Sequence, residues 1–173
     1  MILVGLGPTT VAYRIHTPRW ASAPTSGAGA AAHGGRANRP GLAALYLSLE
    51  IETAVSEYRQ LSPLMPPGTL VSYRLQVDPI VDFRSGYVAG PWPELWQDFG
   101  CDWRQLWFND RLEPPSWVAG DQAIAAGAKG VLFPSQTSGG TNLVLFVDAL
   151  TPADRLEVYD PGHALPKNQD SWR

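Results

Sequence analysis

Glycine and proline restrict what this chain can fold into, because 17 glycines and 16 prolines are spread over only 173 residues. Glycine weakens the interiors of helices and strands, and proline removes a backbone hydrogen-bond donor, so regular elements must be short. Seven tryptophans are available to anchor the loops, and a hydrophobic content of 45% with 17% charged residues is typical of a globular protein. We therefore expect one loop-rich domain over residues 1–173.

Short periodic segments within this frame predict an α+β fold. Alternating or apolar runs predict strands at residues 11–16, 44–49, 70–77, 80–83, 130–133, 142–147 and 156–159. Helices are predicted over residues 51–61, before Pro63, and from Ser116 as N-cap to about residue 126, with Gly127 at the C′ position. The tryptophan-rich stretch 91–108 predicts short helices. Residues 21–41 predict a long loop without periodicity, and the tail after residue 161 is expected to be loose.

Charge and cysteine usage exclude several classes of protein. The net charge is −3 and basic residues form no cluster, so we expect no direct contact with nucleic acid. Cys101 is the only cysteine, which excludes an internal disulfide and fits a reducing compartment. The apolar run from Met1 to Leu6 lacks the basic flank and the length of a secretory signal, and no run approaches the roughly 20 residues that span a bilayer. A cytoplasmic protein without a membrane anchor is expected.

Three familiar motifs are suggested but not supported. Gly5-Leu6-Gly7 hints at a dinucleotide-binding turn, but a helix must follow those glycines, and Pro8 instead leads into a predicted strand. Ser135 lies in Phe-Pro-Ser-Gln, which lacks the Gly-x-Ser-x-Gly spacing of a hydrolase elbow. Metal-ligand residue types are too scattered to predict a metal site: His16, His33, His163 and Cys101.

Four segments, taken in order, carry a stronger pattern. They are Tyr13-Arg14, the run Gly34–Gly41 (GGRANRPG) before a strand with Tyr46, the helix segment Glu52–Tyr58 (ETAVSEY), and residues 132–143 with Ser135 and Asn142. Together they resemble the RES-domain toxins of bacterial toxin–antitoxin pairs, a family named for its Arg, Glu and Ser. The resemblance covers about residues 10–150. It departs at Ala37, where many relatives carry Trp, and residues 79–115 match no motif of the family.

The resemblance implies both a fold and an activity. The fold would be a mixed, mostly antiparallel split β-sheet with flanking helices, like that of the ADP-ribosyltransferase toxins. The activity would be cleavage of the nicotinamide–ribose bond of NAD, with NAD as a consumed substrate and no metal. ADP-ribose would pass to an acceptor, slightly favoured to be a protein side chain. Water or phosphate as acceptor, which would deplete NAD, and a non-catalytic nucleotide-binding module are the alternatives. A further implication is an antitoxin partner with a helix-turn-helix DNA-binding domain.

The resemblance also assigns roles to residues. Glu57 would stabilise the positive charge that develops on the ribose; periodicity does not choose between Glu57 and Glu52, but position in the family does. Arg14 and Arg36 would bind the diphosphate, because guanidinium groups match phosphate oxygens in pairs. A structural ion pair is the alternative for either arginine, and Arg39 is expected to be exposed.

The remaining site residues have equally plain alternatives. Tyr46 would stack on nicotinamide or bond to ribose, unless it is a core residue. Ser135 would bind the nicotinamide amide or orient Glu57, and Asn142 would support the turn that follows Ser135, unless both residues only form the turn. The candidate catalytic residues are thus Glu57, Arg36 and Ser135. Arg14, Arg36, Tyr46, Ser135 and Asn142 are the candidates for binding NAD, and the loop from Ser26 to Gly35 would let the backbone approach it closely.

Overall fold

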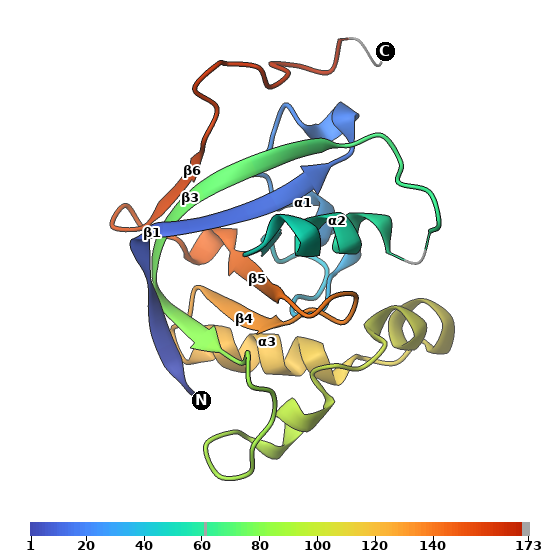
Figure 1. Ribbon diagram of the computed structural model, residues 1–173. Helices are drawn as coiled ribbons and strands as arrows, with labels where there is room; N and C mark the ends of the chain where they lie inside the picture. The colour runs from blue at the N-terminus through green and yellow to red at the C-terminus, as the bar shows by residue number, and fades with distance from the viewer. Residues whose placement is uncertain (61, 171–173) are drawn as a thin grey trace.

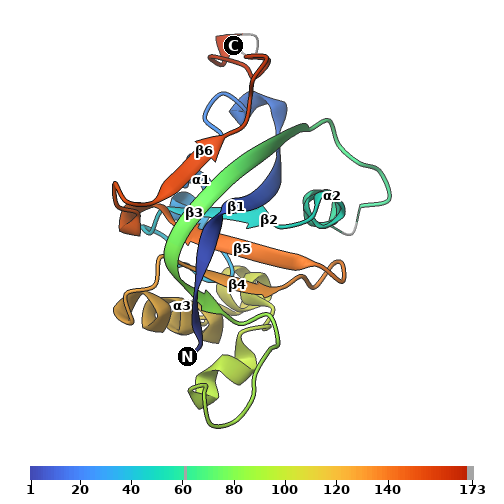
Figure 2. The ribbon, with the colours of Figure 1, turned by 60° about the vertical axis from the view of Figure 1, so that its left-hand side comes forward.

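The computed structural model describes residues 1–60 and 62–170, and in this part five strands close into a barrel to which a sixth strand is added (Figures 1 and 2). The order around the barrel is β1-β2-β5-β4-β3, and β3 pairs again with β1, while β6 pairs with β3. Among the strands of the described residues, only the β3–β4 pair is parallel. The strands are β1 (Leu3–His16), β2 (Ala44–Ser48), β3 (Thr69–Asp82), β4 (Gly130–Pro134), β5 (Thr141–Phe146) and β6 (Arg155–Val158).

Closure of the barrel corrects the expectation of an open, split sheet. The α+β class and the mixed, mostly antiparallel pairing are confirmed, but the two edges of the sheet meet. The physical reason is the length of β1 and β3, each of 14 residues, which pair with one another along most of their length. Each has a second neighbour at one end, since Tyr13 pairs with Ser48 of β2 and Val81 pairs with Val131 of β4.

Both long strands continue through residues that seem to interrupt them. The sequence predicts separate strands at 70–77 and 80–83 because Pro79 cannot donate to a ladder. In the structure Leu6 pairs with Val77 and Val4 with Ile80, so Asp78 and Pro79 together lie opposite Gly5 as a bulge. A second irregularity, between Leu6 and Thr10, absorbs Gly7 and Pro8. The Gly-x-Gly motif is therefore part of β1, which begins at Leu3, eight residues before the strand expected at 11–16.

The apolar core of the described residues forms two clusters, one on each face of the barrel wall. Alternation of side chains along a strand places Leu45 and Leu47 in one cluster and Ala44 and Tyr46 beside the other. The first cluster, with Val71, Tyr73, Leu75 and Val77 of β3, fills the barrel. The second contains Trp92 and Trp96 of the middle segment and covers the outside of β4 and β5. Strands β4 and β5 are thus buried on both faces, which explains their nearly continuous apolar sequences.

Short helices surround the barrel, and their boundaries correct two expectations. The expected loop 21–41 contains α1 (Ala28–His33), an alanine-rich turn too short for a periodicity to be visible. α2 (Ile51–Arg59) agrees with the helix expected from residue 51, whose predicted end at Leu61 lies outside the described residues. α3 (Pro115–Ala125) begins before Ser116, so the N-cap assigned to Ser116 is wrong and Pro114 takes that position. Gly127, at φ +80°, ends α3 as expected.

The tryptophan-rich segment forms short helical turns, as expected. Trp92 and Trp96 are buried against Phe83 and Phe99, with ring centroids about 5 Å apart. Residues 159–170 contain no assigned strand, and no helix in the described part of the chain is long and apolar enough to cross a membrane. The short turns are η1 (Pro18–Trp20), η2 (Glu94–Asp98), the π-helical η3 (Gln105–Asp110) and η4 (Val147–Ala149).

Candidate active site

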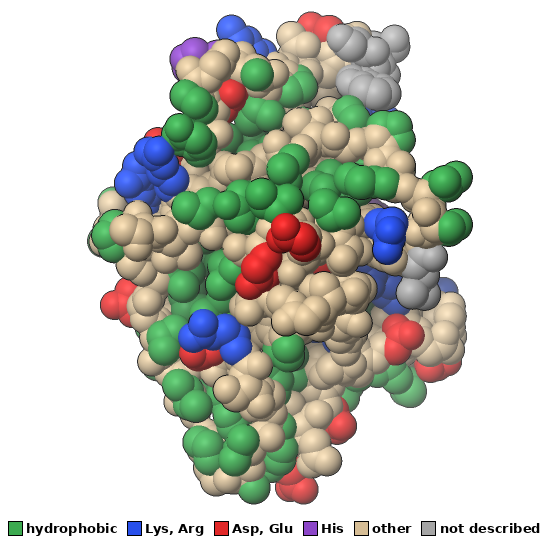
Figure 3. Space-filling model, viewed as in Figure 1, with side chains coloured by type: hydrophobic (Ala, Val, Ile, Leu, Met, Phe, Trp, Pro, Cys, Tyr) green, Lys and Arg blue, Asp and Glu red, His purple; other side chains and the backbone are tan. Residues whose placement is uncertain are grey.

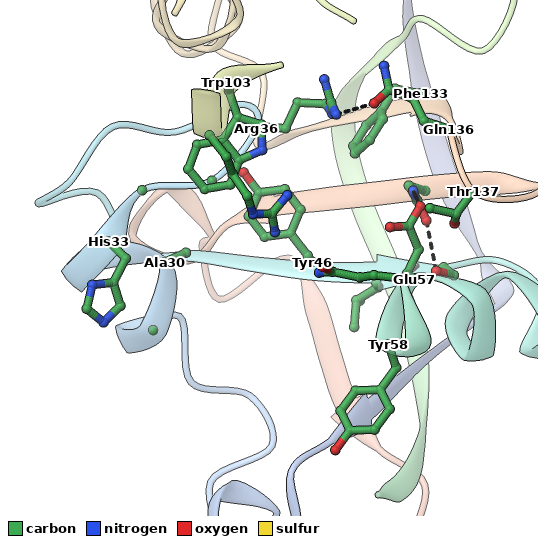
Figure 4. Close-up of a pocket in the computed structure, with 18 of the residues that line it drawn as sticks. Ala30, His33, Arg36, Tyr46, Glu57, Tyr58, Trp103, Phe133, Gln136 and Thr137 are labelled. Carbon is green, nitrogen blue, oxygen red and sulfur yellow. Dashed lines mark hydrogen bonds between the residues drawn. The ribbon is translucent and has the colours of Figure 1, made fainter. Parts of the chain in front are cut away.

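A cleft of about 970 Å³ opens beside the barrel where β1, β2, α1 and α2 come together. Residues 100–109 form its opposite wall, and the turn between β4 and β5 closes one side. Glu57 points into the cleft from α2, with Tyr46 beside it and Arg36 and Gln136 on the facing wall (Figure 4). This volume lies at the upper end of the range for pockets that bind small molecules and cofactors.

Two side chains that flank the β4–β5 turn hold the carboxylate of Glu57 in place. Its Oε1 atom accepts a hydrogen bond from Ser135 Oγ at 2.8 Å and another from Asn142 Nδ2 at 2.5 Å. Ser135 Oγ itself accepts from the backbone N–H groups of Thr137 and Ser138, each at 3.1 Å. Because those donors occupy its lone pairs, the hydroxyl proton of Ser135 is directed at Glu57.

Asn142 is oriented in turn by the neighbouring strand. Its Oδ1 atom accepts from Ser48 Oγ at 2.8 Å, so the amide has one end on β2 and the other on Glu57. Both residues are buried. This leaves Oε2 of Glu57 without a hydrogen-bond partner among the described residues, and it is the oxygen that a bound ligand could use.

Arg36 is anchored to the opposite wall by neutral acceptors. Its Nη1 atom donates to the backbone carbonyls of Phe99 at 3.2 Å and Cys101 at 2.9 Å, and its Nη2 donates to Oε1 of Gln136 at 2.5 Å. Burial of the guanidinium lowers the pKa of Arg36 below its usual value. No carboxylate lies within ion-pair distance of Arg36 in the described residues.

Arg14 is a second cation in the cleft without an acidic partner. It donates to the backbone carbonyl of Tyr46 at 3.3 Å, and burial lowers the pKa of Arg14 as well. Among the described residues it too forms no ion pair. Arg39 provides the contrast, because it pairs with Glu113 and Asp121 and lies outside the cleft lining. Lys and Arg side chains on the face seen in Figure 3 are scattered. Arg14 and Arg36 line the same cleft, and neither forms an ion pair among the described residues.

Tyr46 connects the cleft to the loop that carries Arg36. Its hydroxyl donates to Asn38 Oδ1 at 2.7 Å and accepts from the backbone N–H of Ala37 at 2.9 Å. Burial raises the pKa of Tyr46. A Cβ atom on Gly35 would collide with this hydroxyl and with the Asn38 amide, so glycine is required there by packing. The hydroxyl is therefore occupied, and the ring is the part of Tyr46 that remains for a ligand.

The structure brings most of the expected site residues together. Arg14, Arg36, Tyr46, Glu57 and Asn142 line the cleft, and Ser135 lies directly behind the Glu57 carboxylate. Glu52 is exposed and does not line the cleft, so geometry separates the two glutamates that periodicity could not. Ala37, where the family pattern is broken, is fully buried in the core outside the barrel and does not line the cleft.

Several cleft residues were missed by sequence reasoning. Gln136 contacts Arg36, and Asp102, Trp103 and Arg104 belong to the wall formed by residues 100–109. That wall lies in the segment with no family motif. The density of tryptophans there was the one available indication, and it pointed to packing instead of to a site.

Glycines of the expected ligand-binding loop line the cleft and also permit close packing behind it. Gly29, Gly34 and Gly35 line the cleft, and Gly34 adopts φ +79°, where a Cβ would also press against Trp117. Trp117 Nε1 donates to the carbonyl of Gly35 at 2.6 Å. These glycines thus serve the packing of Tyr46 and Trp117 as well as the shape of the cleft. No group of three or more metal-ligating side chains occurs in residues 1–60 and 62–170.

Comparison with known proteins places this cleft in context. The family model of the RES domain matches residues 11–168, beyond the 10–150 expected from motifs. Curated protein sequences give no significant match. Among solved structures, the crystal structure of the M. tuberculosis MbcT–MbcA toxin–antitoxin complex contains a chain that aligns with a TM-score of 0.58 and 19% sequence identity, over 88% of this chain and 84% of that chain. At this identity the similarity establishes the fold.

Proposed function

The chain belongs to the RES-domain family, and from this premise we propose that it is an enzyme that cleaves the nicotinamide–ribose bond of NAD. One observation carries the proposal: two half-buried guanidinium groups, neither of them in an ion pair among the described residues, share a cleft with a carboxylate fixed by two hydrogen bonds. Buried charges are costly unless they are paired. An anionic ligand such as a diphosphate would supply the missing partner.

Arg14 and Arg36 are suited to bind the diphosphate of NAD. Their present partners are carbonyl groups and the amide oxygen of Gln136, which orient the guanidinium groups without neutralising them. Arginine matches phosphate oxygens with paired N–H donors. Tyr46 offers its ring face to the nicotinamide riboside end, because its hydroxyl already serves the Arg36 loop.

Glu57 would act on the ribose. Cleavage of the bond between C1′ and the nicotinamide nitrogen sends the bonding electron pair to that nitrogen, so neutral nicotinamide leaves and positive charge develops on the ribose. The carboxylate stabilises this charge, and its free Oε2 can accept from a ribose hydroxyl. Ser135 and Asn142 position the carboxylate through Oε1. An acceptor oxygen or nitrogen then attacks C1′ and loses its proton.

The acceptor determines the biological outcome. A preference for a protein side chain followed from the split sheet of ADP-ribosyltransferase toxins, and the closed barrel removes that argument. Water and phosphate therefore stand beside a protein side chain as acceptors to be tested. Similarity to a toxin–antitoxin complex supports a role as a toxin with a cognate antitoxin. The family resemblance implies that this antitoxin carries a helix-turn-helix domain for DNA, and the net charge of −3 on this chain fits a DNA contact made by the partner.

A non-catalytic nucleotide-binding module is the second candidate. A carboxylate placed beside an anionic ligand weakens binding by Coulomb repulsion, so a pure binder gains nothing from Glu57. The two hydrogen bonds to Glu57 restrict its side chain, and that restriction costs conformational entropy. A binding module would not need this carboxylate, so its fixed position is consistent with catalysis instead.

Nicotinamide release tests the proposal directly. Purified protein is incubated with NAD in buffers with and without phosphate, and with cell extract, and products are followed by chromatography and intact-protein mass spectrometry. We expect release by the wild type and by Glu52→Ala, the matched control on the exposed face of α2. Glu57→Ala should still bind ADP-ribose but release no nicotinamide. Equal release by Glu57→Ala and wild type would refute the assignment, and no release under any condition would favour the binding module.

A further inference from the structure

We propose that Gln136 is a positioning residue that orients Arg36 toward the diphosphate of the substrate, an inference that rests on the proposed function. Gln136 lies in the segment 132–143 of the family pattern, but the sequence assigned it no role. Its side chain lies beside Arg36 on the wall of the cleft that faces Glu57 (Figure 4).

The amide of Gln136 joins two parts of the chain at the Arg36 guanidinium. Oε1 accepts from Nη2 of Arg36 at 2.5 Å, while Nε2 donates to the carbonyl of Gly100 at 2.6 Å. The neighbouring carbonyls of Phe99 and Cys101 accept from Nη1 of Arg36. Gln136 thus completes a ring of contacts in which one amide fixes both the guanidinium and the backbone that supports it.

This arrangement determines what Arg36 can still bind. A guanidinium has five N–H donors, and three of them are used by Phe99, Cys101 and Gln136 within the described residues. Two N–H donors of Arg36 remain, one of them Nε–H, and the same three contacts would fix the direction in which both point. A guanidinium fixed in this way binds a phosphate without first losing rotamer freedom, which is the benefit of preorganisation.

Gln136 also couples Arg36 to the carboxylate across the cleft. The preceding residue, Ser135, donates to Glu57, so adjacent residues of one turn contact the two charged groups of the proposed site. The turn is firmly attached to α2, because Ser138 Oγ donates to Thr53 Oγ1 at 3.0 Å and Thr141 N–H donates to Glu50 at 2.8 Å. Its position therefore sets the distance between the diphosphate and the ribose carbon that reacts.

The kinetic consequence differs from that of a catalytic residue. Gln136→Ala frees Nη2 and lets the guanidinium turn, so the KM for NAD and the Kd for ADP should each rise about five- to tenfold. The kcat at saturating NAD should stay within about twofold, because the Glu57 contacts are unchanged. Gln136→Glu places a carboxylate beside Arg36 and removes the donor to Gly100, so it should raise both constants further.

The experiment measures kcat and KM for NAD, and the Kd for ADP by calorimetry, in the wild type, both Gln136 variants, Arg36→Ala and the double variant. Gln76→Ala is the matched control, since it removes an exposed glutamine side chain of β3 that lies outside the cleft lining. Thermal unfolding of each variant checks that it is folded. We expect Gln136→Ala to have no further effect on Kd once Arg36 is alanine.

Unchanged ADP affinity in both Gln136 variants would overturn the positioning role, as would an equal effect of Gln136→Ala with and without Arg36. A fall in kcat without a change in KM would also overturn it. The ADP titration separates this inference from the proposed function. If the wild type releases no nicotinamide but Gln136→Ala weakens ADP binding through Arg36, the positioning role stands and the catalytic proposal fails. If the wild type does not bind ADP, the positioning role fails too.

Discussion

Replacement of Ser135 by alanine probes whether its hydrogen bond to Glu57 matters for turnover. The variant removes the 2.8 Å bond from Ser135 Oγ to Glu57 Oε1 and leaves the bond from Asn142 in place. A hydrogen bond to a charged group contributes about 1.5–3 kcal/mol. Since about 1.4 kcal/mol corresponds to a tenfold change in rate, kcat should fall roughly ten- to hundredfold if the whole contribution is expressed in the transition state. The KM for NAD should change little, because Arg14 and Arg36 do not contact Ser135.

The same change also affects folding, and the assay must separate the two effects. Ser135 Oγ accepts from the backbone of Thr137 and Ser138, so its loss should lower the free energy of unfolding by about 1–2 kcal/mol. Ser138→Ala is the matched control in the same turn. Its hydroxyl bonds to Gly140 N–H and Thr53 but not to Glu57, so it should lose comparable stability while keeping kcat.

Two measurements therefore decide the matter: urea unfolding of the three proteins, and initial rates of nicotinamide release at saturating NAD. The reasoning is refuted if Ser135→Ala retains kcat within twofold of the wild type. It is equally refuted if Ser138→Ala loses as much kcat as Ser135→Ala, because the effect would then arise from a loosened turn.

Three further predictions concern stability and packing. Burial, and to a smaller extent the charge of Arg14, lowers the pKa of His16 from 6.5 to about 4. Because the unfolded chain then binds the proton more readily, the free energy of unfolding should be fully retained above pH 6.5. It should fall toward pH 4 by up to about 1.4 kcal/mol per pH unit. Urea titrations at several pH values should show this slope in the wild type and lose it in His16→Gln. Burial alone would raise the pKa of Asp154, but hydrogen bonds, chiefly from Lys129, lower it to about 2. The resulting contribution to the free energy of unfolding is present above about pH 4 and lost as the pH falls through 2. Lys129→Ala should lower the free energy of unfolding by about 3 kcal/mol at pH 7, as measured by calorimetry. Gly35→Ala should destabilise by about 1–3 kcal/mol and raise the KM for NAD, because the new Cβ displaces the Tyr46 hydroxyl; a wild-type KM in that variant would contradict the role of Tyr46 in supporting the Arg36 loop.

Local patterns predicted the elements of the fold better than they predicted its closure. The apolar runs at β2, β4 and β5 and the amphipathic pattern of α2 were visible because each lies within a few consecutive residues. The barrel depends instead on pairing between β1 and β3, whose partners are more than fifty residues apart. The sequence indicates strand breaks at Pro79 and in the Gly5–Pro8 region. Only the pairing of β1 with β3 shows that irregularities in the register accommodate them.

Ordered motifs predicted which residues gather on the Glu57 side of the cleft, because the family pattern fixes residue types at recognisable positions. Glu57 and Ser135 were identified in this way, and the 2.8 Å bond between them agrees with one of the two roles considered for Ser135. The assignment of Asn142 to the turn was less complete. Its amide bonds to Glu57 and to Ser48 of β2, a connection that needs the β2–β5 pairing to exist.

The opposite wall of the cleft could not be predicted, for a physical reason that bears on the function. Arg36 is bound there by the carbonyls of Phe99 and Cys101, and a backbone carbonyl is supplied equally well by any residue type. Sequence change in residues 79–115 can therefore be extensive while the support of Arg36 is retained, provided that the backbone path is kept by packing such as that of Trp96 on Phe99. Neutral carbonyls orient a cation without cancelling its charge, whereas a carboxylate would be visible in the sequence but would compete with the phosphate. A wall without a motif is thus compatible with the phosphate-binding role that we propose for Arg36.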